Sequence, residues 1–241
     1  MIDHIGQMPS VAAKKFKNKE ALCFEGKSFT FEELSKLIEK FSSSLSSLGI
    51  KEKDVVTLYA SNSWEWIVSY FSIARIGAII NPVNTMLTPS EIKHVVNDCK
   101  AKAIITSSDK VQSIINIKNE TSVSTLITFG KSPQGAEAFN NLIEKETKPI
   151  EMPNISPEDL STIGYTSGTT GHPKGAMQSH KSVVINGAMT SQLHMRGPED
   201  VVVSALPCPH VYANVLMTGM MMFGTKLVLH QTFDPLNVFK D

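Results

Sequence analysis

The sequence predicts an α/β protein with largely parallel sheets flanked by helices in a layered αβα arrangement. Short apolar runs of strand length alternate with segments of helical periodicity through almost all of the chain. Repeated β-α-β units of this kind bring their strands together in parallel and cover both faces of the sheet with helices. The chain has 241 residues, which is enough to bury a substantial core.

The first half of the chain carries clear start and stop signals. Residues 21–24 and 27–29 predict a short hairpin. Thr30 and Glu33 form a capping box for a helix that runs on to Gly49, where a glycine ends it. Further strands are predicted at residues 55–59, 78–80, 103–106 and 125–129, and further helices at 63–75, 89–97, 109–117 and 136–144.

The second half begins with a proline-bearing link at residues 148–157. A strand at 160–165, a helix from Ser179 or His180 and a strand at 201–204 follow it. Residues 211–229 are mostly apolar but are interrupted by polar residues and glycines, whereas a membrane span needs about 20 predominantly apolar residues. We therefore predict a buried helix and then a buried strand, with methionines filling core gaps. The wall of a fatty-acid tunnel is the alternative.

Composition narrows the classes of function. Lys+Arg and Asp+Glu both total 23, so no bulk charge recruits nucleic acid or an anionic membrane. Cys23, Cys99 and Cys208 lie far apart without the spacing of a zinc site, which favours a reducing compartment over a disulfide framework. The N-terminus lacks the regions of a signal peptide. We expect a cytoplasmic protein without a transmembrane segment.

The serines of residues 42–47 are interpreted as a solvated helix face.

One glycine-rich segment, residues 165–175, points to a ligand. It holds three glycines, four Ser/Thr hydroxyls and Lys174, and no acidic residue. Glycines let backbone N–H groups turn toward an anion, and hydroxyls and a lysine add further donors. Strand, glycine-rich loop and helix is an arrangement that binds phosphates, although the Walker A order is absent. We predict a polyphosphate-binding loop; a solvated connector is the alternative.

Residues 165–175 resemble the phosphate-loop signature of the adenylate-forming superfamily, which includes acyl-CoA synthetases, peptide-synthetase adenylation domains and luciferases. Residues 29–34, 77–84 and 206–210 resemble three other segments of that family in the same order. The resemblance implies the N-terminal part of the acyl-CoA-synthetase-like fold. In residues 206–210 Pro209 replaces the family's usual aromatic residue, which changes the shape expected at the acyl entrance.

The resemblance also implies a reaction. A carboxylate attacks the α-phosphorus of ATP, pyrophosphate leaves, and coenzyme A takes the acyl group, with Mg²⁺ assisting. A medium- or long-chain fatty acid is the expected acid. The residues implied for the β- and γ-phosphates are Thr166, Ser167, Gly168, Thr169, Thr170 and Gly171, with Lys174 offsetting their charge. His210 is implied beside the acyl carboxylate and the α-phosphate, against the alternative of a loop histidine satisfied by the backbone.

Family segments implied to hold the metal, the ribose and the mobile lid are not found in the sequence. Residues 1–241 are therefore expected to form an incomplete N-terminal domain, with two α/β subdomains linked near 148–157, no C-terminal lid domain and little activity in isolation. The partners implied are a small-molecule carboxylic acid, ATP and coenzyme A, with a homodimer as one candidate assembly. The alternatives are a non-catalytic nucleotide- or acyl-binding fragment and an adenylation domain that loads a carrier protein.

Overall fold

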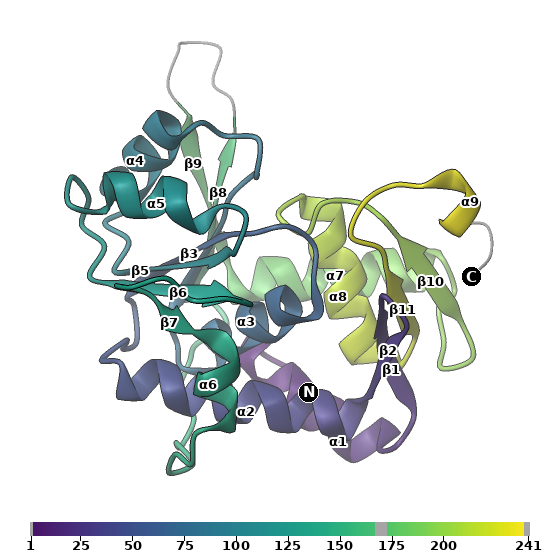
Figure 1. Ribbon diagram of the computed structural model, residues 1–241. Coiled ribbons are helices and arrows are strands. Elements are labelled where there is room, and N and C mark those ends of the chain that lie inside the picture. Colours follow the sequence, from purple (N-terminus) through teal and green to yellow (C-terminus); the bar gives the residue numbers. More distant parts are fainter. Residues whose placement is uncertain (1, 167–172, 239–241) are drawn as a thin grey trace.

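The computed structural model describes residues 2–166 and 173–238. The chain forms two sheets, a four-stranded one in the order β10-β11-β1-β2 and a seven-stranded one in the order β7-β6-β5-β3-β4-β8-β9 (Figure 1). The predicted α/β class with largely parallel sheets is confirmed.

The strands and helices alternate along the chain. The strands are β1 (Glu20–Phe24), β2 (Lys27–Thr30), β3 (Val55–Tyr59), β4 (Ile79–Pro82), β5 (Ala103–Ser107), β6 (Thr125–Phe129), β7 (Glu137–Ala138), β8 (Leu160–Thr166), β9 (Lys174–Ser179), β10 (Val201–Ser204) and β11 (Lys226–Leu229). The helices are the 3-10 turn η1 (Ile5–Gln7), α1 (Met8–Phe16), α2 (Phe31–Ser47), α3 (Trp64–Arg75), α4 (Pro89–Asp98), α5 (Val111–Lys118), α6 (Phe139–Glu144), α7 (His180–Leu193), α8 (Val211–Phe223) and α9 (Pro235–Val238).

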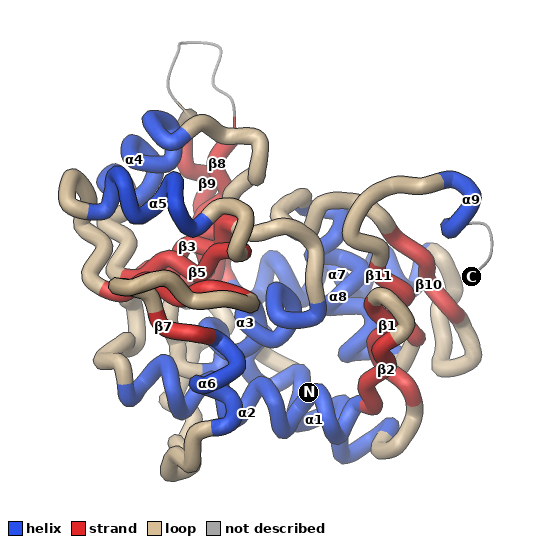
Figure 2. Tube along the Cα trace, viewed as in Figure 1, coloured by secondary structure: helices blue, strands red, loops and turns tan. Residues whose placement is uncertain are grey.

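The large sheet is covered on both faces (Figure 2). Successive side chains of a strand point to opposite faces, so Val55 of β3 packs in the cluster with α4 and α5, and Val56 packs in the cluster with α2 and α3. The side chains of the neighbouring strand β5 divide between the two faces in the same way. Ile104 packs in the cluster with α4 and α5, and Ile105 packs in the cluster with α2 and α3. Strands buried on both faces explain the nearly continuous apolar runs in the sequence.

The small sheet shares its core with the large one. Leu22 of β1 and Leu227 of β11 belong to the same hydrophobic cluster as Val56 and Ile80 of the large sheet. Helix α1 contacts α2, which packs on the large sheet, and α8, which leads into β11 of the small sheet. Residues 148–157 connect α6 to β8, and strands on both sides of that segment belong to the large sheet. The division into two subdomains near this link stays a prediction.

Helix ends follow the local signals. Thr30 Oγ1 accepts a hydrogen bond from the Glu33 N–H at 3.2 Å while the Glu33 carboxylate accepts from the Thr30 N–H at 2.8 Å, which confirms the capping box. Thr88 and Glu91 form a second capping box at the start of α4. Gly49 follows α2 with a φ of 82°, the left-handed conformation that glycine adopts without strain.

The structure departs from the sequence predictions at three places. The glycine-rich loop was predicted to run to residue 175 and no strand was predicted after it, but residues 174–179 form β9, which pairs antiparallel with β8. Residues 136–138 were expected to begin a helix, but β7 occupies 137–138 and α6 starts only at Phe139. Helix α1 and η1 were not predicted. In the first two segments the backbone pairs with the preceding strand, β8 or β6, and local propensity does not report such pairing.

The serine run is also corrected, because Ser42, Ser43 and Ser44 are buried. Helix α2 packs against α3 and α6 at this point, and small side chains let the helices approach closely. The hydroxyls are satisfied by backbone carbonyls: Ser42 Oγ donates to Ile38 O at 2.7 Å, and Ser44 Oγ donates to Leu142 O of α6. Polarity alone therefore did not indicate exposure.

Residues 211–229 form the buried helix α8 and the strand β11, as predicted. Among the described residues, no helix has both the length and the apolar character that a membrane crossing requires.

Helices α7 and α8 pack closely through small residues. A Cβ on Gly187 of α7 would overlap Thr218 Oγ1 of α8, and a Cβ on Gly219 of α8 would lie 2.5 Å from Ser191 Oγ of α7.

Candidate functional site

The carboxyl ends of strands from both sheets meet in one region of the molecule. Strands β3, β4 and β8 are parallel, so the segments that follow them leave from the same edge of the large sheet. Strands β10 and β11 are parallel in the small sheet, and their following segments also line this region. Ligands of open α/β sheets bind outside the carboxyl ends of the strands, so this is the expected place for a site.

A cleft of about 440 Å³ lies where three predicted motif segments converge. It is lined by residues of β4 and the segment after it, of β8 and β9, and of the segment that leads into α8: Pro82, Asn84, Gly164, Tyr165, Thr166, Ala176, Gln178, Pro207, Pro209, His210 and Val211. Segments 77–84, 165–175 and 206–210 are far apart in the sequence, and the fold brings them together here.

The glycine-rich segment begins and ends at paired strands. Thr166, the last residue of β8, is the register partner of Lys174, the first residue of β9, and both are exposed. Among the described residues, no carboxylate forms an ion pair with Lys174. The predicted ligands Ser167, Gly168, Thr169, Thr170 and Gly171 lie outside the described residues. Thr166 and Lys174 therefore mark the base of the predicted phosphate loop.

Gly164 supplies open space on the cleft wall. A Cβ built there has no described heavy atom within 4 Å, whereas a Cβ on Gly175 would lie 2.9 Å from Ile163 Cγ2. Gly164 lines the cleft, so the missing side chain leaves room for a ligand rather than for a neighbouring strand. The sequence prediction did not single this glycine out.

His210 caps the N-terminus of α8 and lines the cleft. Its Nδ1 accepts a hydrogen bond from the Tyr212 N–H at 3.2 Å. A neutral imidazole that accepts through Nδ1 carries its proton on Nε2, so Nε2 is a hydrogen-bond donor. The alternative interpretation was a loop histidine satisfied by the backbone, and such a backbone partner is present. The Tyr212 N–H, however, occupies only one of the two ring nitrogens, Nδ1.

Asn62 holds the segment before His210 in place. This buried residue follows β3, and its Nδ2 donates to Leu206 O at 2.9 Å and to His230 O at 3.0 Å, while its Oδ1 accepts from the Cys208 N–H at 2.7 Å. One amide thus fixes the segments that follow β10 and β11 relative to β3. Sequence reasoning missed Asn62, although a polar residue just after a buried strand was a usable signal.

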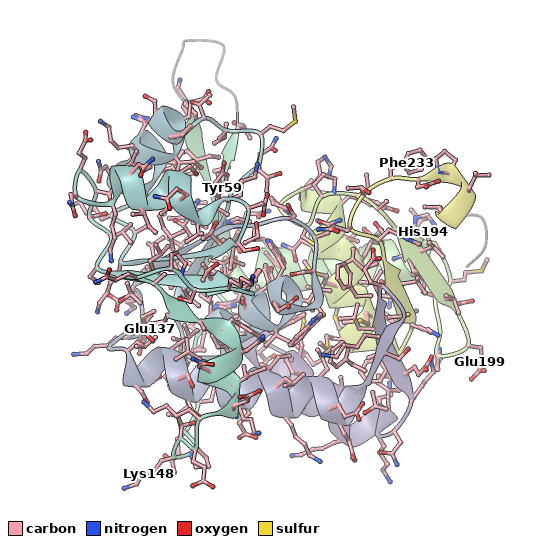
Figure 3. All side chains as sticks on the ribbon, in the orientation of Figure 1. Tyr59, Glu137, Lys148, His194, Glu199 and Phe233 are labelled. Atoms are coloured by element: carbon pink, nitrogen blue, oxygen red, sulfur yellow. The ribbon has the colours of Figure 1, made fainter. Side chains whose placement is uncertain are left out.

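Tyrosines fix the other walls. Tyr59, labelled in Figure 3, ends β3, and its Oη donates to Leu87 O at 3.0 Å, which holds the segment that contains Asn84. Tyr165 of β8 donates to the Asp98 carboxylate of α4. Burial, with a further contribution from the hydrogen bond to Asp98, raises the pKa of Tyr165, so the phenol stays protonated and remains a donor. Neither contact was anticipated from the sequence.

A second cavity of about 750 Å³ adjoins the first. The two share Pro207 and Pro209, and the larger one extends past Tyr212 and Leu216 of α8 to Phe233 on the segment before α9 (Figure 3). Its described walls hold hydroxyls, amides, apolar side chains and one cation, Arg196, but no carboxylate.

A metal site is not evident among the described residues. The 440 Å³ cleft has no carboxylate among its described lining residues, and no group of three His, Cys, Asp or Glu side chains with metal-binding geometry occurs in the described ranges. Mg²⁺ prefers carboxylate, phosphate and water oxygens. The described residues therefore do not fit a protein-held Mg²⁺, and the ion is considered below only as a component of MgATP. The three cysteines are free thiols.

The family is decided by a match that covers nearly the whole chain. Residues 10–241 match the model of the AMP-binding enzyme family. The chain belongs to this family. An indoleacetate–CoA ligase of Aromatoleum aromaticum is 30% identical over 218 residues, which cover 90% of this chain and 43% of that protein. The 4-coumarate–CoA ligase 3 of Arabidopsis thaliana is 32% identical over 216 residues, which cover 86% of this chain and 38% of that protein.

Solved structures support the fold of this AMP-binding protein. A long-chain-fatty-acid–CoA ligase from Archaeoglobus fulgidus superimposes with a TM-score of 0.91 at 24% identity, over 98% of this chain and 49% of that one. This likeness confirms the predicted acyl-CoA-synthetase-like fold. The chain spans about two fifths of the length of the curated relatives it matches, 43% and 38% for the two above.

Proposed function

We propose that this AMP-binding protein serves the ATP-dependent activation of a carboxylic acid to an acyl-adenylate, followed by transfer of the acyl group to coenzyme A with release of AMP. The observation that carries the proposal is the junction of the two cavities at Pro207 and Pro209, with the base of the glycine-rich segment on one side and a largely apolar cavity on the other. A reaction that joins a nucleotide to an organic acid needs two such compartments.

The 440 Å³ cleft is the nucleotide side of the proposed site. Lys174 and Thr166 stand at the base of the segment whose residues 167–171 are proposed to contact the β- and γ-phosphates. Lys174 offers a cation that no described carboxylate pairs with, and Gly164 leaves room for the ligand beside β8. Donors placed in advance around phosphates stabilise the charge that develops as pyrophosphate leaves, without reorganisation during the reaction. MgATP is the proposed form of the substrate.

His210 stands at the boundary between the compartments. It lines the nucleotide cleft, while Tyr212, two residues later, lines the larger cavity. Its Nε2–H is proposed to donate to the acid's carboxylate or to an α-phosphate oxygen, with Nδ1 held by the α8 backbone. In this proposal the reacting carboxylate lies at the start of α8. No described residue is proposed as a nucleophile, because the acid itself attacks the α-phosphorus.

The larger cavity is the proposed site for the body of the acid. Val202, Leu206, Leu216 and Phe233 give it apolar walls, which suit the predicted medium- or long-chain aliphatic acid. The names of the relatives above mention an aromatic acid, a coumarate and long-chain fatty acids. We propose an acid with an extended apolar body, acting with ATP and coenzyme A in the cytoplasm.

Calorimetric titration of the 241-residue chain with MgATP tests the nucleotide cleft. We expect Lys174→Ala to weaken ATP binding about tenfold or more, because a charge-assisted contact to phosphate contributes about 1.5–3 kcal/mol. Lys148→Ala is the matched control, since Lys148 lies at the opposite end of the molecule from the β8–β9 pair (Figures 1 and 3). Equal ATP affinity in both variants, or no ATP binding by the unchanged chain, would contradict the proposal.

The acceptor and the completeness of the site are tested separately. Carboxylate-dependent exchange of labelled pyrophosphate into ATP reports adenylate formation, and thioester formation with free coenzyme A against a carrier protein reports the acceptor. We expect the isolated chain to bind ATP but to exchange pyrophosphate far more slowly than an intact enzyme of the family. Exchange at normal enzyme turnover would show that residues 1–241 suffice for the chemistry.

A further inference from the structure

Among the described residues that line the 750 Å³ cavity, one carries a positive charge. Arg196 follows the C-terminus of α7 and lines this cavity together with Val202 and Leu216. Its Nη1 is buried and has no hydrogen-bond partner among the described residues. A buried guanidinium nitrogen normally finds an acceptor, because an unsatisfied polar group costs about 1–3 kcal/mol and a charged one more.

The described residues do not compensate this charge. No ion pair joins Arg196 to a described carboxylate, and the described walls of the cavity hold no Asp or Glu. Glu199 and Asp200 follow closely in sequence, but neither forms an ion pair with Arg196. Asp200 instead accepts a hydrogen bond from the Gly197 N–H at 2.7 Å. The other arginine of the chain, Arg75, by contrast pairs with Glu39 at 3.2 Å.

Helix packing fixes the distance between Arg196 and the proposed reaction centre. Arg196 Nη1 would lie 3.8 Å from a Cβ on Gly219, so the guanidinium rests against α8 at that point. Tyr212, at the entrance beside His210, and Gly219 are two turns of α8 apart, which is about 10 Å along the helix. The absence of a side chain at Gly219 leaves space for the guanidinium against α8.

We propose that Arg196 is a specificity-determining residue that pairs with a second carboxylate at the distal end of the acid substrate. The inference rests on the proposed function and makes it more specific, since it selects an α,ω-dicarboxylic acid of medium length over the corresponding monocarboxylic acid. The reacting carboxylate lies near His210, the apolar chain crosses the walls formed by Val202 and Leu216, and the second carboxylate meets Arg196. Guanidinium and carboxylate match in charge and in two-point geometry.

Binding of a matched pair of acids tests the inference. Octanoate and octanedioate, with shorter and longer pairs, are titrated calorimetrically into the chain in the presence of MgATP. We expect the dicarboxylate of best length to bind at least about tenfold more tightly than its monocarboxylic partner. Arg196→Met should remove this preference and change the affinity for octanoate by less than about twofold. Arg75→Met, which removes the other arginine, should keep the preference.

The outcomes separate this inference from the proposed function. If the monocarboxylic acid binds as tightly as the dicarboxylate, or if Arg196→Met keeps the preference, the inference is wrong while the acid site stands. If neither acid binds at any length, the acid-binding proposal falls and takes the inference with it. Thermal unfolding of Arg196→Met gives a second measurement. If Arg196 serves to bind a ligand and has no ion-pair partner among the described residues, its removal should leave the Tm unchanged or raise it. A clear fall in Tm would point to a structural role instead.

Discussion

Tyr70 Oη donates a hydrogen bond to Asn214 Oδ1 at 2.8 Å and so connects the interior of α3 to the first turn of α8. Tyr70 is fully buried and stacks on Trp66, with 5.6 Å between the ring centroids. Burial raises the pKa of Tyr70, so the phenol remains a donor. His210 caps the same helix four residues before Asn214, so this hydrogen bond also steadies the proposed reaction centre.

Tyr70→Phe should lower the free energy of unfolding by about 1–2 kcal/mol, because Asn214 Oδ1 loses its donor while the ring is retained. Urea unfolding followed by circular dichroism measures the change. Tyr212→Phe is the control, since Tyr212 is partly exposed and its substitution should change stability by less than about 0.5 kcal/mol. Equal effects of the two substitutions would remove the special role of Tyr70.

Gly164→Val should separate ligand binding from folding. A Cβ at this position has no described heavy atom within 4 Å, and valine is a good strand residue, so the Tm should change little. The same side chain would project into the cleft proposed for the nucleotide, so MgATP affinity should fall by about tenfold or more. Calorimetry and thermal unfolding measure the two effects. Retained ATP affinity in a folded variant would place the nucleotide elsewhere.

Asn62→Asp should destabilise the segment before α8. The substitution keeps the shape of the side chain but replaces the donating NH₂ group with an oxygen that faces Leu206 O and His230 O. Two lost hydrogen bonds and an added buried charge should cost about 3 kcal/mol or more. Hydrogen exchange of the Cys208 amide, which donates to Asn62 at 2.7 Å, reports the local effect. Unchanged protection of that amide would contradict the structural role of Asn62.

The contact between α7 and α8 predicts a pair of compensating substitutions. Gly187→Ala should destabilise the protein by about 1–3 kcal/mol, because the new Cβ overlaps Thr218 Oγ1 and approaches Met222 Cε to 3.1 Å. Thr218→Ala removes the obstructing atoms, so the double variant should be more stable than the sum of the single effects predicts. Chemical unfolding of the four proteins gives the coupling energy. Additive effects would show that the helices do not meet at these residues.

The buried histidines predict a pH dependence of stability. Burial lowers the pKa of His180 from 6.5 to about 4, and His4, whose ring centroid lies 5.7 Å away, acts in the same direction. Between about pH 4 and pH 6.5, His180 is protonated in the unfolded chain but neutral in the folded chain. The free energy of unfolding should therefore fall as the pH drops from about 6.5 toward 4, by up to about 1.4 kcal/mol per unit.

His180→Asn tests this pH dependence. Asparagine keeps an acceptor for the Ile5 N–H, which now donates to His180 Nδ1 at 3.3 Å, but it does not titrate. Burial also lowers the pKa of His4, so a smaller slope from that residue should remain. Urea unfolding at several pH values measures the slope for both proteins. An equal slope in the variant and the unchanged chain would exclude His180 as its source.

Features that depend on neighbouring residues were predictable from the sequence. The capping box of Thr30 and Glu33, the helix end at Gly49 and the order of strands and helices all follow from contacts within a few residues. The glycine-rich segment and its family could also be identified from the sequence, because one continuous stretch of chain carries the pattern.

How separate segments form the site depends on long-range packing, which no local stretch of the sequence specifies. Strand β9 exists through its pairing with β8, Asn62 meets Cys208 across 146 positions of the chain, and Arg196 reaches the cavity through the close approach of α7 and α8. Each of these contacts joins residues whose local sequence gives no sign of the other. They form because burial of a common core and the parallel alignment of strands bring the carboxyl ends of two sheets together.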